Sequence, residues 1–306
     1  MTQLFSHLRV SSEYSISQGL LTVDQIVDNA IRNSVPSVAL TDKSNMFGLV
    51  KFFNKCESAG IKPISGSSIR LIFDDDDTSY ELLCLAKTNN GHKNLMKIIS
   101  NAHNNNSFNQ PIIKFNDLIE LKDDIIVISG GKDSHIFEYL KSNNISDASK
   151  RIDDFRNSFG DNFVLDVQLT NRIDEIEYLK NVLPIAKDKS IPLIATNDVL
   201  FAEQEDYEIH ETKVCINTGK TLNDPNRERV FSEHQYFKSP QEMIELFKDY
   251  DSLIDNTNEI SKKCNVSLET KGYFLPEYPV PKKHDFDSFL KEISTKRIES
   301  YTKDFD

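Results

Sequence analysis

Short apolar runs separated by helical patterns make up most of the chain. Four of them are "SVALTD" (37–42), "DIIVISGG" (124–131), "NFVLDVQL" (162–169) and "IPLIATND" (191–198). Runs of this length, rich in Val, Ile and Leu, are typical of strands buried on both faces of a parallel sheet. Strands that alternate with helices favour an α/β barrel or a doubly wound sheet.

Two helix starts are well marked. Thr22 and Gln25 have the spacing of a capping box, and apolar residues follow at helical intervals. Ser239 and Glu242 repeat the signature, with Pro240 at the first helical position.

One hairpin interrupts the alternation. The stretches "SIRLIF" (68–73) and "SYELLCLA" (79–86) flank "DDDDT". The four aspartates, Asp74 to Asp77, could form a cation site. We interpret them instead as a solvated turn tip.

The stretch "HLRVSSEYS" (7–15) reads as a first strand. Side chains alternate along a strand, so His7, Arg9 and Ser11 would share one face, and Leu8 and Val10 the other. We interpret His7 as a hydrogen-bonded structural residue. In both candidate folds the site lies at the carboxyl ends of the strands. Polar or glycine residues follow the predicted strands there: Arg9, Ser11, Asp42, Lys43, Gly130, Gly131, Asn197 and Asp198.

Composition narrows the class of protein. The 306 residues are 38% apolar and carry a net charge of −12, which argues against general nucleic-acid binding by this chain. No run approaches the roughly 18 apolar residues that span a bilayer, and the N-terminus does not resemble a signal peptide, so we expect a cytoplasmic protein. Cys56, Cys84, Cys215 and Cys264 lack the spacing of a zinc or disulfide framework and are expected to be reduced.

The amino-acid composition changes near residue 270. "YFLPEYPVPKKHDFDSF" is rich in proline and aromatics and reads as a linker, and "FDSFLKEISTKRIESYTKDFD" reads as a helix that is then cut. We therefore expect a first domain at residues 1–270, followed by a linker and a truncated helix at 271–306.

Several motifs occur in an order known from one family. They are "HLRVSSEYS", "ALTDKSNMFGLVKFF", "GIKPISGSSI", "LLCLAKTNNGHKNLMKIIS", "IIVISGG", "IATNDVLF" and "YFLPEYPVP". Together they resemble the N-terminal PHP (polymerase and histidinol phosphatase) domain of bacterial DNA polymerase III alpha subunits. The resemblance covers the whole chain. It implies a distorted (β/α)7 barrel, and makes the helix after residue 284 the entry to the polymerase region.

The resemblance also implies where metal ligands would stand. Metal-binding members have histidines or acids at most of these positions, whereas this chain has Arg9, Ser11, Gln18, Lys43, Ser68, Glu81, Gly131, Asp198 and Leu200. Asp198 alone keeps the ligand type of the family. These residues predict a degenerate cleft with no metal and no catalytic residue.

Arg9 and Lys43 determine whether the cleft can bind a metal. A site for transition metals needs several imidazoles and carboxylates, and cationic side chains cannot ligate a metal. We interpret the two cations as replacing the lost metals, and expect them to pair with Asp198 and Glu81. The alternative is an Arg9 that points into solvent.

Three functions follow from the resemblance. The first is a catalytically silent domain that supports the polymerase and receives its proofreading exonuclease subunit. The parent protein would then be a DNA-directed DNA polymerase with magnesium in a later region. The second is an active metal-dependent phosphoesterase or 3′–5′ exonuclease. The third is a DNA-binding module, which the net charge disfavours.

Overall fold

The computed structural model describes residues 4–76, 78–104, 110–268, 275 and 277–302. The chain divides into two compact units, Met1–Leu268 and Glu269–Asp306. Each unit is described by itself. None of the helices formed by the described residues is both long and apolar enough to span a bilayer.

The first unit is built on one mixed sheet. Its strands are β1 (Ser37–Leu40), β2 (Lys62–Ile72), β3 (Ser79–Ala86), β4 (Ile113–Lys114), β5 (Ile125–Ile128), β6 (Phe163–Gln168) and β7 (Leu193–Thr196). They run in the order β1-β2-β3-β5-β6-β7, and β4 pairs with β2. Within the described residues, β3 pairs antiparallel with β2 and β5, and the other pairs are parallel. The four buried runs and the hairpin are thus confirmed as strands.

The N-terminal segment joins the two ends of this sheet. His7 bridges Val38 of β1, and Val10 bridges Val199, just beyond β7. The sheet therefore curls into the distorted barrel that the sequence led us to expect. The segment is not the regular strand we predicted, because it makes isolated bridges instead of a continuous ladder.

This irregularity changes the side-chain pattern. Leu8 packs inside the barrel, whereas Val10 packs in a separate cluster beneath the helices α1 (Val23–Arg32) and α2 (Leu49–Ser58). His7 does not share a site with Arg9. Its Nε2 lies 2.8 Å from the Lys238 carbonyl oxygen, as expected of a structural histidine.

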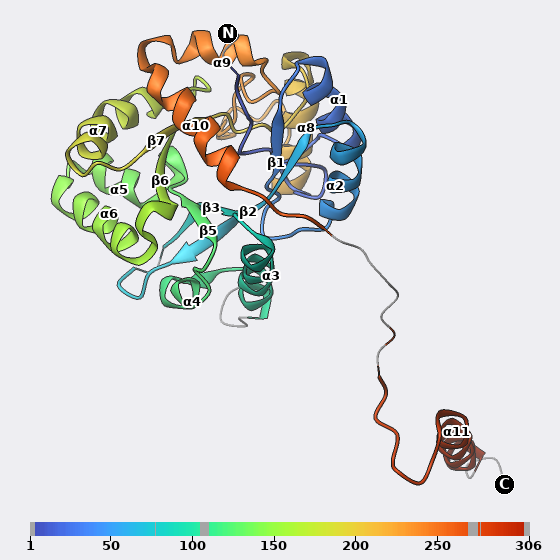
Figure 1. Cartoon of the computed structure of the whole chain (residues 1–306). Helices are drawn as coiled ribbons and strands as arrows, with labels where there is room; N and C mark the ends of the chain where they lie inside the picture. The colour runs from blue at the N-terminus through green and yellow to red at the C-terminus, as the bar shows by residue number, and fades with distance from the viewer. Residues whose placement is uncertain (1–3, 77, 105–109, 269–274, 276, 303–306) are drawn as a thin grey trace. The chain divides into compact units, whose positions relative to one another are not determined.

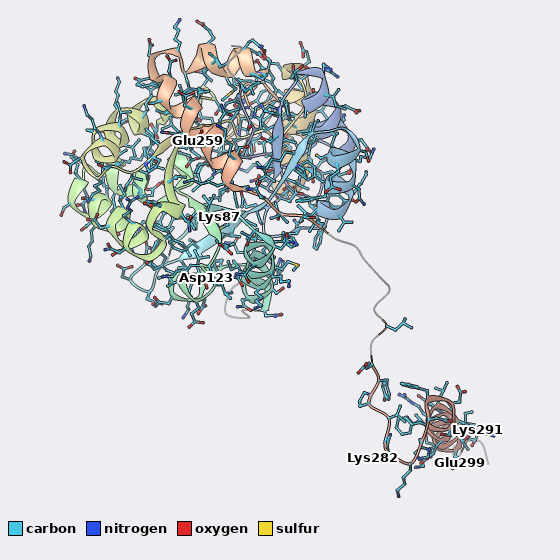
Figure 2. All side chains as sticks on the ribbon, in the orientation of Figure 1. Lys87, Asp123, Glu259, Lys282, Lys291 and Glu299 are labelled. Atoms are coloured by element: carbon cyan, nitrogen blue, oxygen red, sulfur yellow. The ribbon has the colours of Figure 1, made fainter. Side chains whose placement is uncertain are left out.

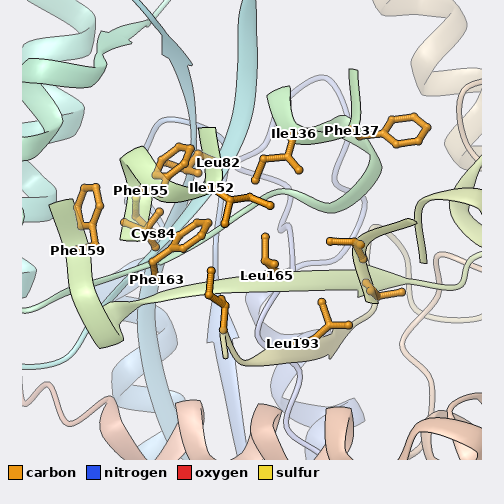
Figure 3. Packing of buried hydrophobic residues seen from close by; sticks show 14 of the residues in the cluster. Leu82, Cys84, Ile136, Phe137, Ile152, Phe155, Phe159, Phe163, Leu165 and Leu193 are labelled. Atoms are coloured by element: carbon orange, nitrogen blue, oxygen red, sulfur yellow. The ribbon is translucent and has the colours of Figure 1, made fainter. Parts of the chain in front are cut away.

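The side chains on the two faces of the sheet form two separate apolar layers. The barrel interior holds one set: Leu8, Ala39, Ile64, Leu83, Leu85, Ile126, Ile128, Val164 and Ile194. The intervening residues face the helices, where Phe163 and Leu165 of β6 pack with Phe155 and Ile152 (Figure 3). The four cysteines are free and buried.

Helices cover the outside of the barrel (Figure 1). In the first unit they are α1 (Val23–Arg32), α2 (Leu49–Ser58), α3 (Asn89–Asn104), α4 (Phe115–Glu120), α5 (His135–Lys141), α6 (Ile145–Phe159), α7 (Glu175–Asp188), α8 (Tyr207–Thr218), α9 (Pro240–Leu246) and α10 (Asp251–Lys263). The predicted capping boxes are present at Thr22 and Ser239. Charged side chains such as Lys87, Asp123 and Glu259 lie on the outside of this unit (Figure 2).

The second unit contains the helix α11 (Phe286–Thr302), where the pattern predicted one. None of its described residues is buried, and Lys291 and Glu299 project from it (Figure 2).

The described aspartates of the hairpin lie at an exposed turn, in keeping with our interpretation as a solvated turn tip, but two of them also contact side chains of neighbouring helices. Asp75 accepts two hydrogen bonds from Nη2 of Arg151, at 3.0 and 3.1 Å. Asp76 lies 3.1 Å from Nε2 of the buried His135. The guanidinium of Arg151 also lies 3.6 Å from the centre of the Phe73 ring. Residue 77 lies outside the described residues, but side chains of α5 and α6 hold the described part of the turn.

Candidate functional site

A polar cleft opens at the carboxyl ends of the parallel strands, above the apolar interior of the barrel. Its cavity of about 640 Å³ is lined by six of the nine residues predicted from the sequence. They are Ser11, Gln18, Lys43, Ser68, Glu81 and Asp198. Among them, Glu81 faces the cleft because alternate residues of a strand point to the same side, and Leu83 and Leu85 of the same strand point into the barrel.

Arg9 is only 2% exposed and does not line the cavity itself, but it contacts Glu81, which does. Its Nη1 donates a hydrogen bond to Oε1 of Glu81, and its Nη2 lies 3.8 Å from Oδ2 of Asp166. Burial alone would lower the pKa of Arg9, but the charges of Glu81 and Asp166, aided by Asp198 and Asp133, raise the pKa above its ordinary value. Arg9 is therefore a permanently charged group that faces carboxylates, and the solvent-facing alternative is wrong.

One expected pairing of Arg9 is also wrong. Asp198 makes no direct ion pair with Arg9 among the described contacts, although their charges interact at longer range. Its Oδ2 accepts a hydrogen bond of 2.7 Å from Nε2 of Gln235 and lies 3.8 Å from Nη1 of Arg172. Two side chains from loops, Arg172 and Gln235, thus take the place that we had assigned to Arg9.

Asp166 is the carboxylate that the sequence analysis missed. It is fully buried on β6, with the same parity as the interior residue Val164. Oδ1 accepts hydrogen bonds from Ser129 Oγ at 2.9 Å and from the Gly131 amide at 2.7 Å. Oδ2 accepts one from Thr196 Oγ1 at 3.0 Å. Three elements that meet at the cleft are therefore tied to one charged group.

The glycines after β5 allow the chain to approach this point. Gly130 has φ +93°, and a Cβ there would lie 2.3 Å from the carbonyl oxygen of Glu81. A side chain at this position would displace the start of β3. Gly131, predicted at a former ligand position, supplies its backbone amide to Asp166 instead.

Lys43 stands at the mouth of the cleft. Its Nζ lies 3.8 Å from Oε2 of Glu81, as predicted, and its side chain is 27% exposed. The preceding residue, Asp42, fixes this loop by accepting hydrogen bonds from Ser12 and Ser15. Burial raises the pKa of Asp42, against these hydrogen bonds.

Arg172 completes a chain of alternating charges. Nη1 lies 3.2 Å from Oδ2 of Asp133, and Nε donates to Oε1 of Glu175 at 3.0 Å. Burial would lower the pKa of Arg172, but Asp198, Asp133 and Glu175 raise it.

Leu200 lies apart from the cleft. Its side chain is 1% exposed and does not line the cavity, and its backbone pairs with Leu20 and Gln235.

The residues of the cleft do not fit a metal centre. No three His, Cys, Asp or Glu side chains within the described part of the chain are arranged to hold a metal ion. Arginine, lysine, serine and leucine occupy most of the positions where ligands would stand, and the two cations would repel a divalent ion.

The sequence and fold define the class of this chain. The PHP domain family matches residues 7–170, more than half of the chain, and the chain belongs to this family. It is 38% identical to the DNA polymerase III subunit alpha of Pseudomonas aeruginosa, over 98% of this chain and 26% of that protein. It is also 38% identical to that of Escherichia coli K12, over 90% of this chain and 24% of that protein. The chain thus spans about a quarter of the length of these relatives.

The fold resembles that of a solved protein with a very different sequence. An amidohydrolase from Chromobacterium violaceum, solved with bound sulfate and no metal, matches 68% of this chain and 96% of its own. The TM-score is 0.50 at 10% identity, so the likeness concerns the fold alone.

Proposed function

We propose that this chain is the N-terminal PHP domain of a replicative DNA polymerase III alpha subunit, with a cleft that stabilises the fold instead of carrying out metal-dependent chemistry. The similarity to alpha subunits along nearly the whole chain supports the parent protein. The residues of the cleft support its structural role.

The observation that carries the proposal is the buried Arg9 guanidinium, in contact with Glu81 and close to Asp166. A carboxylate left unpaired at such a place is destabilising, and an arginine compensates its charge permanently. Loss of Arg9 would leave Glu81 and Asp166 without their buried countercharge. The cleft is then a set of ion pairs that fixes the β2–β3 hairpin against β6.

In this proposal the chain alone is catalytically inactive and needs no cofactor. The full-length protein would be a cytoplasmic DNA-directed DNA polymerase, and its magnesium ions would be held by carboxylates in another region. The domain would contact the remainder of the alpha subunit and would bind the proofreading exonuclease subunit. Its net charge of −12 gives it little affinity for DNA by itself.

Metal content and hydrolytic activity test the structural role. The purified chain, without a histidine tag, should hold no stoichiometric zinc or manganese after dialysis. It should hydrolyse neither a chromogenic phosphate ester nor a labelled single-stranded DNA. The alternative is a metal-dependent phosphoesterase or 3′–5′ exonuclease. Turnover that depends on added metal and disappears in Asp198→Ala would establish that alternative and overturn the proposal.

A binding experiment tests the partner. The exonuclease subunit should bind the purified chain in calorimetry, and Lys43→Ala should leave its affinity unchanged, because the proposal places the dock outside the cleft. Binding by the full alpha subunit but not by this chain would place the dock elsewhere.

A further inference from the structure

A second hollow of the first unit lies between the start of α2 and the C-terminal half of α3, and we call it the α2–α3 groove. Its cavity of about 510 Å³ is lined by Phe47 on one side and by Met96, Ser100 and His103 on the other. Phe47 is 70% exposed and Met96 is 44% exposed. Among the described residues, none that lines this groove is acidic, and none of them lines the cleft. The groove is therefore a separate surface with an apolar lining.

The exposed ring of Phe47 stands on a loop that side chains hold in place. Asn45 Oδ1 accepts a hydrogen bond of 3.2 Å from the Phe47 amide, and Asn45 Nδ2 donates one of 3.0 Å to the Tyr14 carbonyl oxygen. His103 Nε2 lies 2.8 Å from the Ser44 carbonyl oxygen, which ties α3 to the same loop. A preformed apolar surface loses little conformational entropy when a partner covers it, and exposed apolar patches mark interaction sites.

The α3 side of the groove is positively charged in an otherwise acidic chain. Residues 87–116 contain no aspartate or glutamate, although the whole chain has 48 acidic residues. Lys93 and Lys97 are exposed on α3. Because residues three or four apart on a helix are neighbours, these lysines lie beside Met96 and Ser100.

The α2 side adds both apolar surface and positive charge. Val50, in the first turn of α2, is 52% exposed. Lys51 and Lys55 both form ion pairs with the carboxylate of Asp24, so two cations share one anion. An apolar surface thus lies between cations from two helices. The complementary ligand has an apolar side chain with carboxylates on both sides of it.

We propose that the α2–α3 groove docks a partner protein through a short acidic segment with an apolar anchor. The apolar side chains of that segment would pack against Phe47 and Met96, and its carboxylates would pair with Lys93 and Lys97. Nucleic acid fits less well, because the apolar lining offers no donor to phosphates. The inference goes beyond the proposed function, since it concerns a surface outside the cleft and holds whether or not the cleft is inert.

Fluorescence anisotropy tests the inference, with the full chain titrated into the labelled peptide Asp-Asp-Leu-Leu-Asp-Asp. The peptide should bind saturably, and its affinity should fall as salt is added. Phe47→Ser and the double variant Lys93→Glu/Lys97→Glu should each weaken binding about tenfold or more. The peptide Asp-Asp-Ser-Ser-Asp-Asp, which lacks the anchor, should bind at least about tenfold more weakly.

Matched variants control for exposure and charge. Ile209→Ser changes a side chain that is 61% exposed on α8, and Lys150→Glu/Lys180→Glu reverses two exposed lysines on α6 and α7. Both should bind the peptide like wild type. Thermal melts should show all variants folded, because the changes are at exposed positions.

Several outcomes would overturn the inference without affecting the role proposed for the cleft. One is the absence of saturable binding up to about 1 mM chain. Another is equal affinity of wild type and Phe47→Ser, or of the two peptides, because attraction by charge alone would then suffice. A wild-type dimer in sedimentation that Phe47→Ser dissociates, without peptide binding, would assign the groove to a second copy of this chain. Binding of a DNA duplex that Lys93→Glu/Lys97→Glu weakens, without peptide binding, would assign it to nucleic acid.

Discussion

Two arginines hold the same hairpin in different surroundings. Arg9 contacts Glu81 near the start of β3, and Arg151 contacts Asp75 in the turn between β2 and β3. Of the partners of Arg9, Asp166 is 0% and Glu81 21% exposed, whereas Asp75 is 64% exposed. In both pairs a guanidinium nitrogen lies within ion-pair distance of a carboxylate oxygen. Burial of the partner decides how much each charge matters, since breaking a buried pair costs several times more than breaking an exposed one.

The two arginines also differ in what else they contact. Arg151 lies over the face of Phe73, at 3.6 Å from the ring centre, so part of its contribution is packing. Arg9 is surrounded by carboxylates. Removing only the charge of a partner carboxylate should therefore change the stability less at the Arg151 end of the hairpin, where packing also contributes, than at the Arg9 end.

The largest effect is expected at Arg9. Arg9→Ala leaves Glu81 and Asp166 without their countercharge and should lower the free energy of unfolding by about 3–5 kcal/mol. Arg9→Lys should recover part of this loss, because it keeps a cation beside these carboxylates. Denaturant unfolding is the measurement. The matched control is Arg32→Ala, which breaks an ion pair with Glu203 between side chains 63% and 51% exposed. Equal losses in Arg9→Ala and Arg32→Ala would remove the distinction between buried and exposed pairs.

The second largest loss of stability is expected for Asp166→Asn. The change keeps the shape of the side chain, but it removes the charge that faces Arg9 and puts an amide donor against the donors Ser129 and Gly131 or Thr196. We expect a loss of roughly 2–3 kcal/mol in the free energy of unfolding. The comparison to make is with Asp75→Asn in the same assay. A loss no greater than that of Asp75→Asn would mean that Asp166 is not part of the buried network.

Asp75→Asn should cost less than about 1 kcal/mol, and the loss should shrink in high salt. Burial acts to raise the pKa of Asp75, but the hydrogen bonds and charge of Arg151 outweigh it, so the pKa is lowered on folding. A lowered carboxyl pKa stabilises the fold above the unfolded pKa, and this contribution is lost as the pH falls through the folded pKa. The difference from wild type should therefore vanish in acid. Arg151→Ala should cost more than Asp75→Asn, because it also removes the contact with Phe73, and thermal melts over a pH and salt series would reveal any other order.

The smallest effect, with the opposite sign, is expected at Asp198. Burial raises the pKa of Asp198, against the charges of Arg172 and Arg9. A raised carboxyl pKa favours the protonated form on folding, so the stabilising contribution is present in acid and is lost as the pH rises through the folded pKa. Asp198→Asn can keep the hydrogen bond from Gln235, and at pH 7 it should be as stable as wild type or more so. This advantage should diminish in acid. A clear loss of stability at pH 7 would show that the charge of Asp198 is needed.

The buried apolar runs made much of the fold and part of the cleft predictable. The buried runs gave β1, β5, β6 and β7, and the residues after these runs pointed to the correct edge of the sheet. Asp166 could also have been found, because it is a charged residue inside the otherwise apolar run "NFVLDVQL".

The remaining partners could not be deduced from the local pattern. Arg172 and Gln235 come from loops far apart in the sequence, and only the folded chain brings them to Asp198. The contact between the exposed Asp75 of the turn and Arg151 could not be predicted, because Arg151 lies 76 residues further along the chain. Position alone does not decide orientation either, since Leu200 stands at a family position but packs away from the cavity.

The most direct test is a crystal structure of the wild-type chain soaked in Mn²⁺, with anomalous diffraction recorded at the manganese edge. The account predicts the guanidinium of Arg9 in contact with Glu81 and near Asp166, with no anomalous peak in the cleft. An anomalous peak coordinated by Glu81 and Asp198, with Arg9 turned away from them, would contradict it.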